Sequence, residues 1–208
     1  MKRRWLLGSL LSLLLAPGCL PVITPPLRAD VGGAKRFDAE PAFVRTSVGA
    51  HAASLVTSPD FPVDGGGGYV NYLRTRERGA DGRTRREQVQ GAYVEASTRV
   101  IGGEYWRVFA GGRGEALLPA GVGERTGYSA LGRASAEFMV PLRFQPVAVA
   151  SNKGAFLGLA YGMFGVGAYL EGGMQRLPTG PSTGVVGGGL TLRVPTAMGI
   201  FCCLWPKK

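Results

Sequence analysis

Histidine, lysine and asparagine are scarce in this chain of 208 residues. His51 is the only histidine, lysine occurs at five positions, and asparagine occurs only at Asn71 and Asn152. One histidine cannot supply the multi-histidine ligand sets of common zinc sites, and any serine–histidine hydrolase would depend on that single residue. So few lysines and asparagines are unusual for a soluble domain, whose surface has to be hydrated. The positive charge of the chain is therefore carried by arginine.

The first 18 residues have the pattern of an export signal. Lys2, Arg3 and Arg4 precede an apolar run at 5–16 that is too short to cross a bilayer as a helix. We expect residues 1–18 to be removed. About 190 residues then remain, which is enough for one domain with its own core. The formal net charge of +10 falls to +7 (10 − 3) with the loss of the three basic signal residues.

The end of the signal resembles the lipobox of bacterial lipoproteins, in which small residues precede a cysteine that is acylated before the signal is cut away. The motif at 15–19 reads Leu-Ala-Pro-Gly-Cys, and it departs from the usual pattern at Ala16 and Pro17. The resemblance implies that membrane lipid is attached to Cys19. Because Leu20 rather than an aspartate follows the cysteine, it also implies the outer membrane as the location. The alternative is an ordinary signal-peptidase site beside an unmodified Cys19.

Basic charge on an exported protein favours anionic partners of the cell envelope. Such a protein meets the phosphates of lipopolysaccharide and other acidic polymers, so we expect a glycolipid or envelope polymer rather than nucleic acid. The densest basic segment, at 74–88, predicts a hairpin that binds anions through Arg74, Arg76, Arg78, Arg83, Arg85 and Arg86. A solvated hairpin end is the alternative. No cofactor, metal ligand or catalytic residue is assigned.

Glycine is abundant, with 34 residues, and the chain shows a period of two from residue 42 onward. Long alternating segments separated by turn residues predict an all-β fold, an antiparallel up-and-down barrel of about eight strands. Residues 19–41 contain several prolines and predict a flexible tether. The barrel then occupies 42–200, and 201–208 form a C-terminal tail. The expected strands are 42–57, 68–79, 86–101, 104–118, 126–140, 142–151, 154–172 and 183–195.

Each alternating segment has one apolar and one charged face. At 126–140 the even positions are apolar, whereas Arg133 and Glu137 stand at odd positions. Strands this long, and a charged face that holds both signs, favour a membrane barrel with a polar lumen. The body is in this respect similar to the small eight-stranded outer-membrane proteins. A narrow lumen requires paired charges, and the candidate network is Glu95, Arg99, Arg107, Arg113, Glu115, Arg133 and Glu137.

Several functions are consistent with these features. The preferred interpretation is an outer-membrane lipoprotein barrel with a structural or ligand-binding role and no catalysis. One alternative is a lipid-modifying hydrolase or acyltransferase centred on His51, and another is a soluble periplasmic barrel that is tethered by lipid and binds an apolar ligand inside. Cys202 and Cys203 are consistent with buried thiols, a vicinal disulfide or pairing with another chain.

Overall fold

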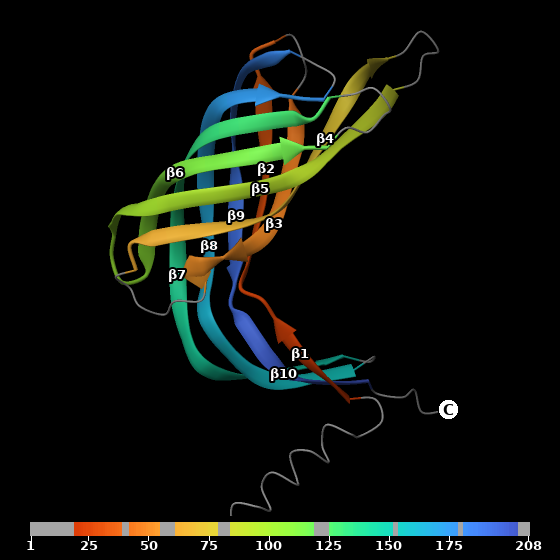
Figure 1. Ribbon diagram of the computed structural model, residues 1–208. Coiled ribbons are helices and arrows are strands. Elements are labelled where there is room, and N and C mark those ends of the chain that lie inside the picture. The colour runs from red at the N-terminus through yellow and green to blue at the C-terminus, as the bar shows by residue number, and fades with distance from the viewer. Residues whose placement is uncertain are drawn as a thin grey trace, which may run out of the picture.

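Two groups of strands make up the molecule: a closed eight-stranded antiparallel barrel and a smaller sheet beyond one end of it (Figure 1). The computed structural model describes residues 19–38, 42–54, 61–78, 84–118, 125–151, 154–178 and 181–203. The all-β, antiparallel barrel expected from the sequence is confirmed. The described residues contain no helix that is both long enough and apolar enough to cross a membrane.

The barrel strands follow one another in an up-and-down order, and each pairs with the next along the chain. The last strand pairs with the first, for example Leu192 with Ala29, which closes the ring and leaves no free edge in the barrel. The 3₁₀ turn η1 (Ala52–Ser54) follows the second of these strands. The strands are β2 (Leu27–Arg36), β3 (Phe43–His51), β4 (Val63–Arg78), β5 (Thr84–Gly102), β6 (Trp106–Leu117), β7 (Gly127–Ser151), β8 (Gly154–Arg176) and β9 (Ser182–Val194).

The charged face of the strands lies inside the barrel and the apolar face lies outside. In β7, for example, Arg133 and Glu137 are buried, whereas Ala134 and Phe138 between and beside them are exposed. Among the described outward-facing side chains of the barrel strands, the charged ones are Lys35 and Arg176, near the ends of β2 and β8, and Arg143, where β7 leaves the barrel. These strands therefore enclose charged side chains, whereas the soluble-barrel alternative requires the charged face to lie in water.

The smaller sheet, called here the tail sheet, lies outside the barrel. It consists of β1 (Cys19–Thr24), β10 (Thr196–Cys203) and the adjoining ends of β8 and β7, in the order β1-β10-β8-β7. It contains residues 145–151 of β7 and 154–161 of β8. The β4–β5 hairpin projects from the opposite end of the barrel (Figure 1). We refer to these two ends of the barrel as the tail end and the hairpin end.

The tail sheet continues four neighbouring strands of the barrel wall beyond a common bend. The chain of β2 continues into β1 across Pro25 and Pro26, and that of β9 continues into β10 across Pro195. β7 shifts register between Leu142 and Gln145, where its ladder with β8 becomes irregular. β8 itself passes through the bend at Gly162. All four interruptions lie at the tail end, so the wall turns there as a unit.

Gly162 requires the absence of a side chain for two reasons. Its φ angle is +122°, a conformation that L-residues with a side chain rarely adopt. A Cβ at this position would also lie 2.1 Å from the carbonyl oxygen of Ser54 in η1. The bend in β8 and the packing of η1 against it therefore depend on glycine at 162.

Three boundaries expected from the sequence need correction. Residues 19–41 are not a simple flexible tether, because they contain β1 and the barrel strand β2. Residues 142–151 do not form a separate strand, because β7 continues through Pro141. The barrel does not extend to residue 200, because β10 at 196–203 belongs to the tail sheet. Residues 204–208 of the expected C-terminal tail lie outside the described residues.

Candidate functional site

The lumen holds nearly balanced charges. Among the described residues, the buried side chains include seven arginines and six carboxylates. One of these arginines, Arg36, forms an ion pair with the half-exposed Asp38 at the hairpin end, at 2.6 Å. Six arginines then remain against six carboxylates, which is the neutrality that a low-dielectric interior requires. They are Arg28, Arg45, Arg107, Arg113, Arg133 and Arg193 with Asp30, Asp64, Glu95, Glu115, Glu137 and Glu171.

Asp30 of β2 accepts hydrogen bonds from three arginines and a serine. Arg28 donates through Nε at 3.2 Å, Arg113 through Nη1 at 3.3 Å and Arg133 through Nη2 at 2.9 Å. The hydroxyl of Ser47 donates at 2.9 Å to Oδ2, the same oxygen that Arg113 contacts. These partners come from β2, β3, β6 and β7, so a single carboxylate links opposite sides of the barrel.

Glu95 of β5 contacts the same three arginines. Its oxygens lie 2.9 Å from Arg28 Nη2, 3.5 Å from Arg113 Nη1 and 3.6 Å from Arg133 Nε. Three guanidinium groups therefore share two carboxylates in the centre of the lumen. Arginine suits this arrangement because its planar group offers several donors in fixed directions.

Two tyrosine rings support these arginines. The guanidinium of Arg113 lies 3.7 Å from the ring centroid of Tyr93, and that of Arg133 lies 3.8 Å from the ring centroid of Tyr169. Cation–π contacts of this kind stabilise the charge where water is excluded. The aromatic rings thus fix the arginines in position between the carboxylates.

A second group of contacts lies toward the hairpin end. Arg113 Nε donates to Glu115 at 2.8 Å, and the hydroxyl of Tyr72 donates to the same carboxylate. Arg45 forms an ion pair with Glu171 and lies 3.6 Å from Glu115. Through Arg113, this group is continuous with the central one.

A third group lies toward the tail end, around Arg193. Its Nη2 donates to Asp64 at 2.6 Å, and its Nε donates to Glu137. Asp64 also lies 3.2 Å from His51 Nδ1. The other ring nitrogen of His51 lies 3.1 Å from the hydroxyl of Tyr93. An aspartate and a tyrosine thus contact the two ring nitrogens, and among the described residues no serine or cysteine lies against the histidine as an activated nucleophile would.

Apolar layers close the lumen on both sides of the charges. Toward the tail end, Phe109, Met139 and Met163 form a buried cluster. Toward the hairpin end, the buried apolar residues form a larger cluster, composed of Ala34, Phe43, Val70, Tyr72, Val89, Tyr93, Leu117, Leu131, Leu177 and Val185. An eight-stranded barrel is just narrow enough to be filled by side chains. The described residues therefore form a packed interior with its charges enclosed, not an open channel.

The structure brings most of the predicted network together. Glu95, Arg113, Glu115 and Arg133 share the contacts described above, and Glu137 pairs with Arg193. Two members lie apart from the centre: Arg107 is buried and donates to Met139 Sδ at 3.7 Å, and Arg99 is half-buried near the tail end. Six further members of the charge network were not predicted from the sequence: Arg28, Asp30, Arg45, Asp64, Glu171 and Arg193. The alternation that places Arg45, Glu171 and Arg193 on the inner face could have identified these three.

The arginine-rich hairpin lies at the end of the barrel away from the tail sheet. Arg74, Arg76 and Arg78 belong to β4 and Arg85 and Arg86 to β5, where the structure gives the backbone path but not the side chains. Arg83 lies outside the described residues. Cys19 is the first residue of β1, and its acylation stays a prediction.

The described residues contain no group of three or more His, Cys, Asp or Glu side chains arranged to hold a metal ion. No protein-family model matches the chain, and no curated protein or solved structure gives a match. The polarity of the barrel and its enclosed charges are therefore the features that bear on function.

Proposed function

We propose that this protein is an integral outer-membrane β-barrel with a structural, non-catalytic role, whose packed lumen conducts neither ions nor solutes. The observation that carries the proposal is the reversed polarity of the barrel, with charges inside and apolar side chains outside. A barrel in water has the opposite arrangement, because burial of apolar surface drives its folding.

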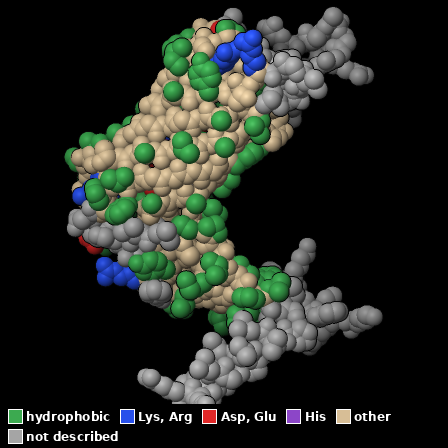
Figure 2. All heavy atoms as spheres, in the orientation of Figure 1, with side chains coloured by type: hydrophobic (Ala, Val, Ile, Leu, Met, Phe, Trp, Pro, Cys, Tyr) green, Lys and Arg blue, Asp and Glu red, His purple; other side chains and the backbone are tan. Residues whose placement is uncertain are grey.

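The outward surface of the barrel supports a lipid environment. Leu170, in the middle of the barrel part of β8, is 71 % exposed. Figure 2 shows hydrophobic side chains spread over the visible barrel wall, with basic side chains toward its ends. Soluble monomers rarely expose contiguous apolar surface on this scale. The exposed apolar side chains of the barrel strands include Val31, Val44, Val48, Val94, Phe138, Val166, Leu170, Val186, Leu190 and Leu192.

Aromatic side chains lie toward both ends of the apolar surface. Tyr69 and Tyr128 are exposed toward the hairpin end, and Trp106 and Phe138 are exposed toward the tail end. Tyr105 contacts Phe138, with ring centroids 6.2 Å apart. Girdles of aromatic residues at both interfaces are a property of transmembrane barrels. Their spacing along the strands supports a barrel that crosses the bilayer along its axis.

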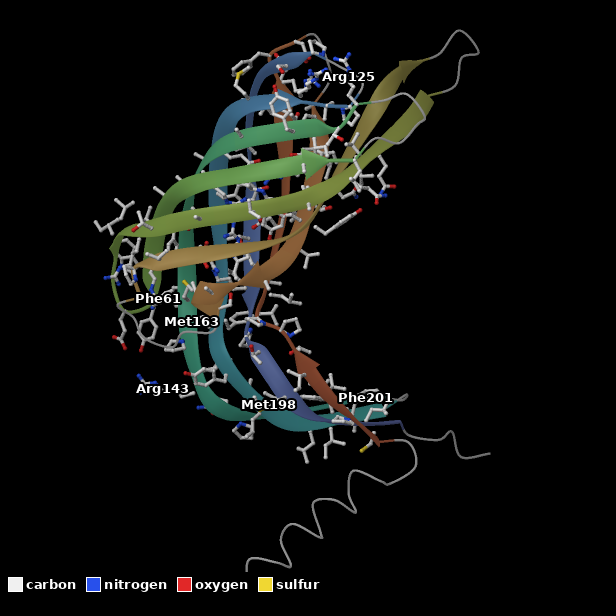
Figure 3. All side chains as sticks on the ribbon, viewed as in Figure 1. Phe61, Arg125, Arg143, Met163, Met198 and Phe201 are labelled. Atoms are coloured by element: carbon white, nitrogen blue, oxygen red, sulfur yellow. The ribbon has the colours of Figure 1, made fainter. Side chains whose placement is uncertain are left out.

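The arrangement of the two ends supports an orientation and a partner. The tail sheet, with the first and last described strands β1 and β10, lies at one end, whereas the arginine-rich hairpin and the exposed Arg125 lie at the other (Figures 1 and 3). If the tail sheet faces the periplasm, the hairpin faces the outer leaflet, where lipopolysaccharide carries its phosphates. We propose that these phosphates are the anionic partner of the hairpin.

Extraction and electrophoresis test the proposal. The mature chain with Cys19→Ala should stay in the membrane fraction and need detergent for solubility, because its barrel wall and not a lipid anchor holds it there. An unheated sample should migrate differently from a boiled one in a denaturing gel, because a closed barrel resists detergent until it is heated. Release of the variant into buffer, with one mobility before and after heating, would overturn the proposal.

A pair of substitutions distinguishes lipid from water around the barrel wall. Leu170→Lys should lower the free energy of unfolding by about 2–4 kcal/mol if the wall faces hydrocarbon. In water the same change would be nearly neutral, because the side chain is already exposed. Phe37→Lys is the matched control, since Phe37 is 73 % exposed but lies beyond the end of β2. Equal stability of the two variants would contradict the membrane location.

A further inference from the structure

The tail sheet contains a disulfide-bonded cysteine, Cys202 of β10. The chain has three cysteines, so the partner within the chain is Cys19 or Cys203. These two candidates lead to different covalent structures. A bond to Cys203 would close a small ring between neighbours, whereas a bond to Cys19 would join the first and last described strands.

The strand geometry separates the two candidates. Cys202 and Cys203 are consecutive residues of an extended strand, so their Cα atoms are about 3.8 Å apart. A disulfide needs Cα atoms about 4.4–6.8 Å apart. Cys19 is instead the register partner of Cys202 in the antiparallel ladder between β1 and β10. Directly opposite residues in such a ladder have Cα atoms about 4.5–5.5 Å apart, within the required range.

We infer that Cys19 and Cys202 form a disulfide that ties β1 to β10 in the mature protein, and that Cys203 remains a thiol. β1 is an edge strand of the tail sheet and is held by a ladder of six residue pairs with β10 alone. Chain ends fray unless they are tied down. The bond lies at the outermost pair of this ladder, where it fixes both strands against separation.

A disulfide at Cys19 excludes the acylation that the lipobox predicts. A sulfur atom that is bonded to another sulfur cannot also carry the thioether of a lipid anchor. The disulfide therefore replaces acylation at Cys19, and the barrel wall alone holds the protein in the membrane. Export to an oxidising compartment is required, and in this respect the inference rests on the proposed function.

The chemistry of bond formation is ordinary thiol–disulfide exchange. One cysteine thiolate attacks the disulfide of an envelope thiol oxidase and forms a mixed disulfide. The second cysteine thiolate then displaces the oxidase, which leaves as its dithiol. The two cysteine thiols lose two protons and two electrons in total, and the oxidase disulfide takes up both.

Thiol counting on the full-length gene product tests the inference. The protein is purified in detergent from its own envelope, denatured without reductant, and labelled with a maleimide. One thiol should react before reduction and three should react after it, and the N-terminal peptide should carry no diacylglycerol. A mass that includes a diacylglyceryl group on Cys19, or incorporation of radiolabelled palmitate at this residue, would overturn the inference.

Two serine variants identify the bonded pair. In Cys203→Ser, the peptide that contains Cys19 should remain linked to the C-terminal peptide in a digest made without reductant. In Cys202→Ser, this link should be lost and two thiols should react. The inference is wrong if the link survives in Cys202→Ser and is lost in Cys203→Ser. Heat-dependent migration of the reduced protein tests the barrel separately, so failure of the disulfide and failure of the membrane proposal can be distinguished.

Discussion

The substitution Asp30→Asn tests whether the enclosed charges stabilise the barrel. It preserves the size of the side chain and removes its negative charge. The Asp30 side chain is 1 % exposed and accepts hydrogen bonds from Arg28, Arg113 and Arg133. After the substitution, the six buried arginines of the network face five carboxylates instead of six. One positive charge is then left without compensation in an interior that water does not reach.

The expected loss follows from the contacts of Asp30. Removal of one member of a buried ion pair costs about 3–5 kcal/mol. Glu95 lies 2.9–3.6 Å from the same three arginines and offsets part of the lost interaction. We therefore expect Asp30→Asn to lower the free energy of unfolding by about 3 kcal/mol, at the lower end of this range.

The matched control is Asp38→Asn, which removes the same charge from an ion pair at the hairpin end. The Asp38 side chain is 25 % exposed, and its partner is Arg36, at 2.6 Å. Asp38 is partly open to water, and the buried Arg36 keeps a hydrogen bond from its Nη2 to the carbonyl oxygen of Pro181 at 3.0 Å. This variant should therefore lose about 1 kcal/mol, less than Asp30→Asn.

Urea unfolding in lipid vesicles, followed by tryptophan fluorescence, measures both variants. Trp106 is a suitable reporter because it is exposed on the barrel wall. The double variant Asp30→Asn/Arg133→Leu restores equal numbers of buried charges and should be more stable than Asp30→Asn alone. If Asp30→Asn is as stable as Asp38→Asn, the network does not stabilise the barrel and the reasoning is refuted.

Two further predictions use the same unfolding assay. Arg133→Leu should cost several kcal/mol because it strands buried carboxylates, whereas Ala134→Leu on the outer face should be nearly neutral; the reverse order would place the apolar face inside. Gly162→Ala should lower stability by at least about 1–3 kcal/mol, because it combines a positive φ with a close approach to the Ser54 carbonyl. Gly172→Ala is its control, since a Cβ there would lie 3.5 Å from its nearest neighbour, and equal losses at both positions would contradict the role of Gly162.

The alternation of residue types made most of the barrel predictable. Arg133 and Glu137 share a parity with the small polar residues of β7, and their burial follows once the strand belongs to a narrow closed barrel. The same rule holds for Glu95 in β5 and Arg113 in β6. Each strand carries this information locally, because successive side chains of a strand point to opposite faces.

The closing strand could not be identified in this way. β2 contains Gly32 and Gly33 and follows Pro25 and Pro26, so its sequence is typical of a linker. Its place in the barrel depends on pairing with β9, about 160 residues away along the chain, and local patterns carry no information on such contacts. Loss of β2 from the prediction also removed Asp30, which accepts hydrogen bonds from three arginines of the lumen.

Proline ends a strand at one position of this chain and lies within a strand at another, and the sequence alone does not distinguish the two cases. Pro141 was expected to separate two strands, yet β7 continues through it, because the ladder becomes irregular just beyond, between Leu142 and Gln145. Proline is tolerated at such irregularities because a missing donor there breaks no regular hydrogen bond. At Pro195 the strand does end, and the chain enters the tail sheet.

The two edge strands of the tail sheet each contain a proline. Pro21 lies in β1, and Pro146 lies in the end of β7. A proline on an edge strand removes a backbone donor and hinders pairing with another chain. Its two faces, by contrast, carry apolar side chains such as Met198 and Phe201, which lie on opposite sides of β10 (Figure 3). Both edges of the tail sheet therefore disfavour pairing with a fifth strand, and its apolar faces are the surfaces that can contact other molecules.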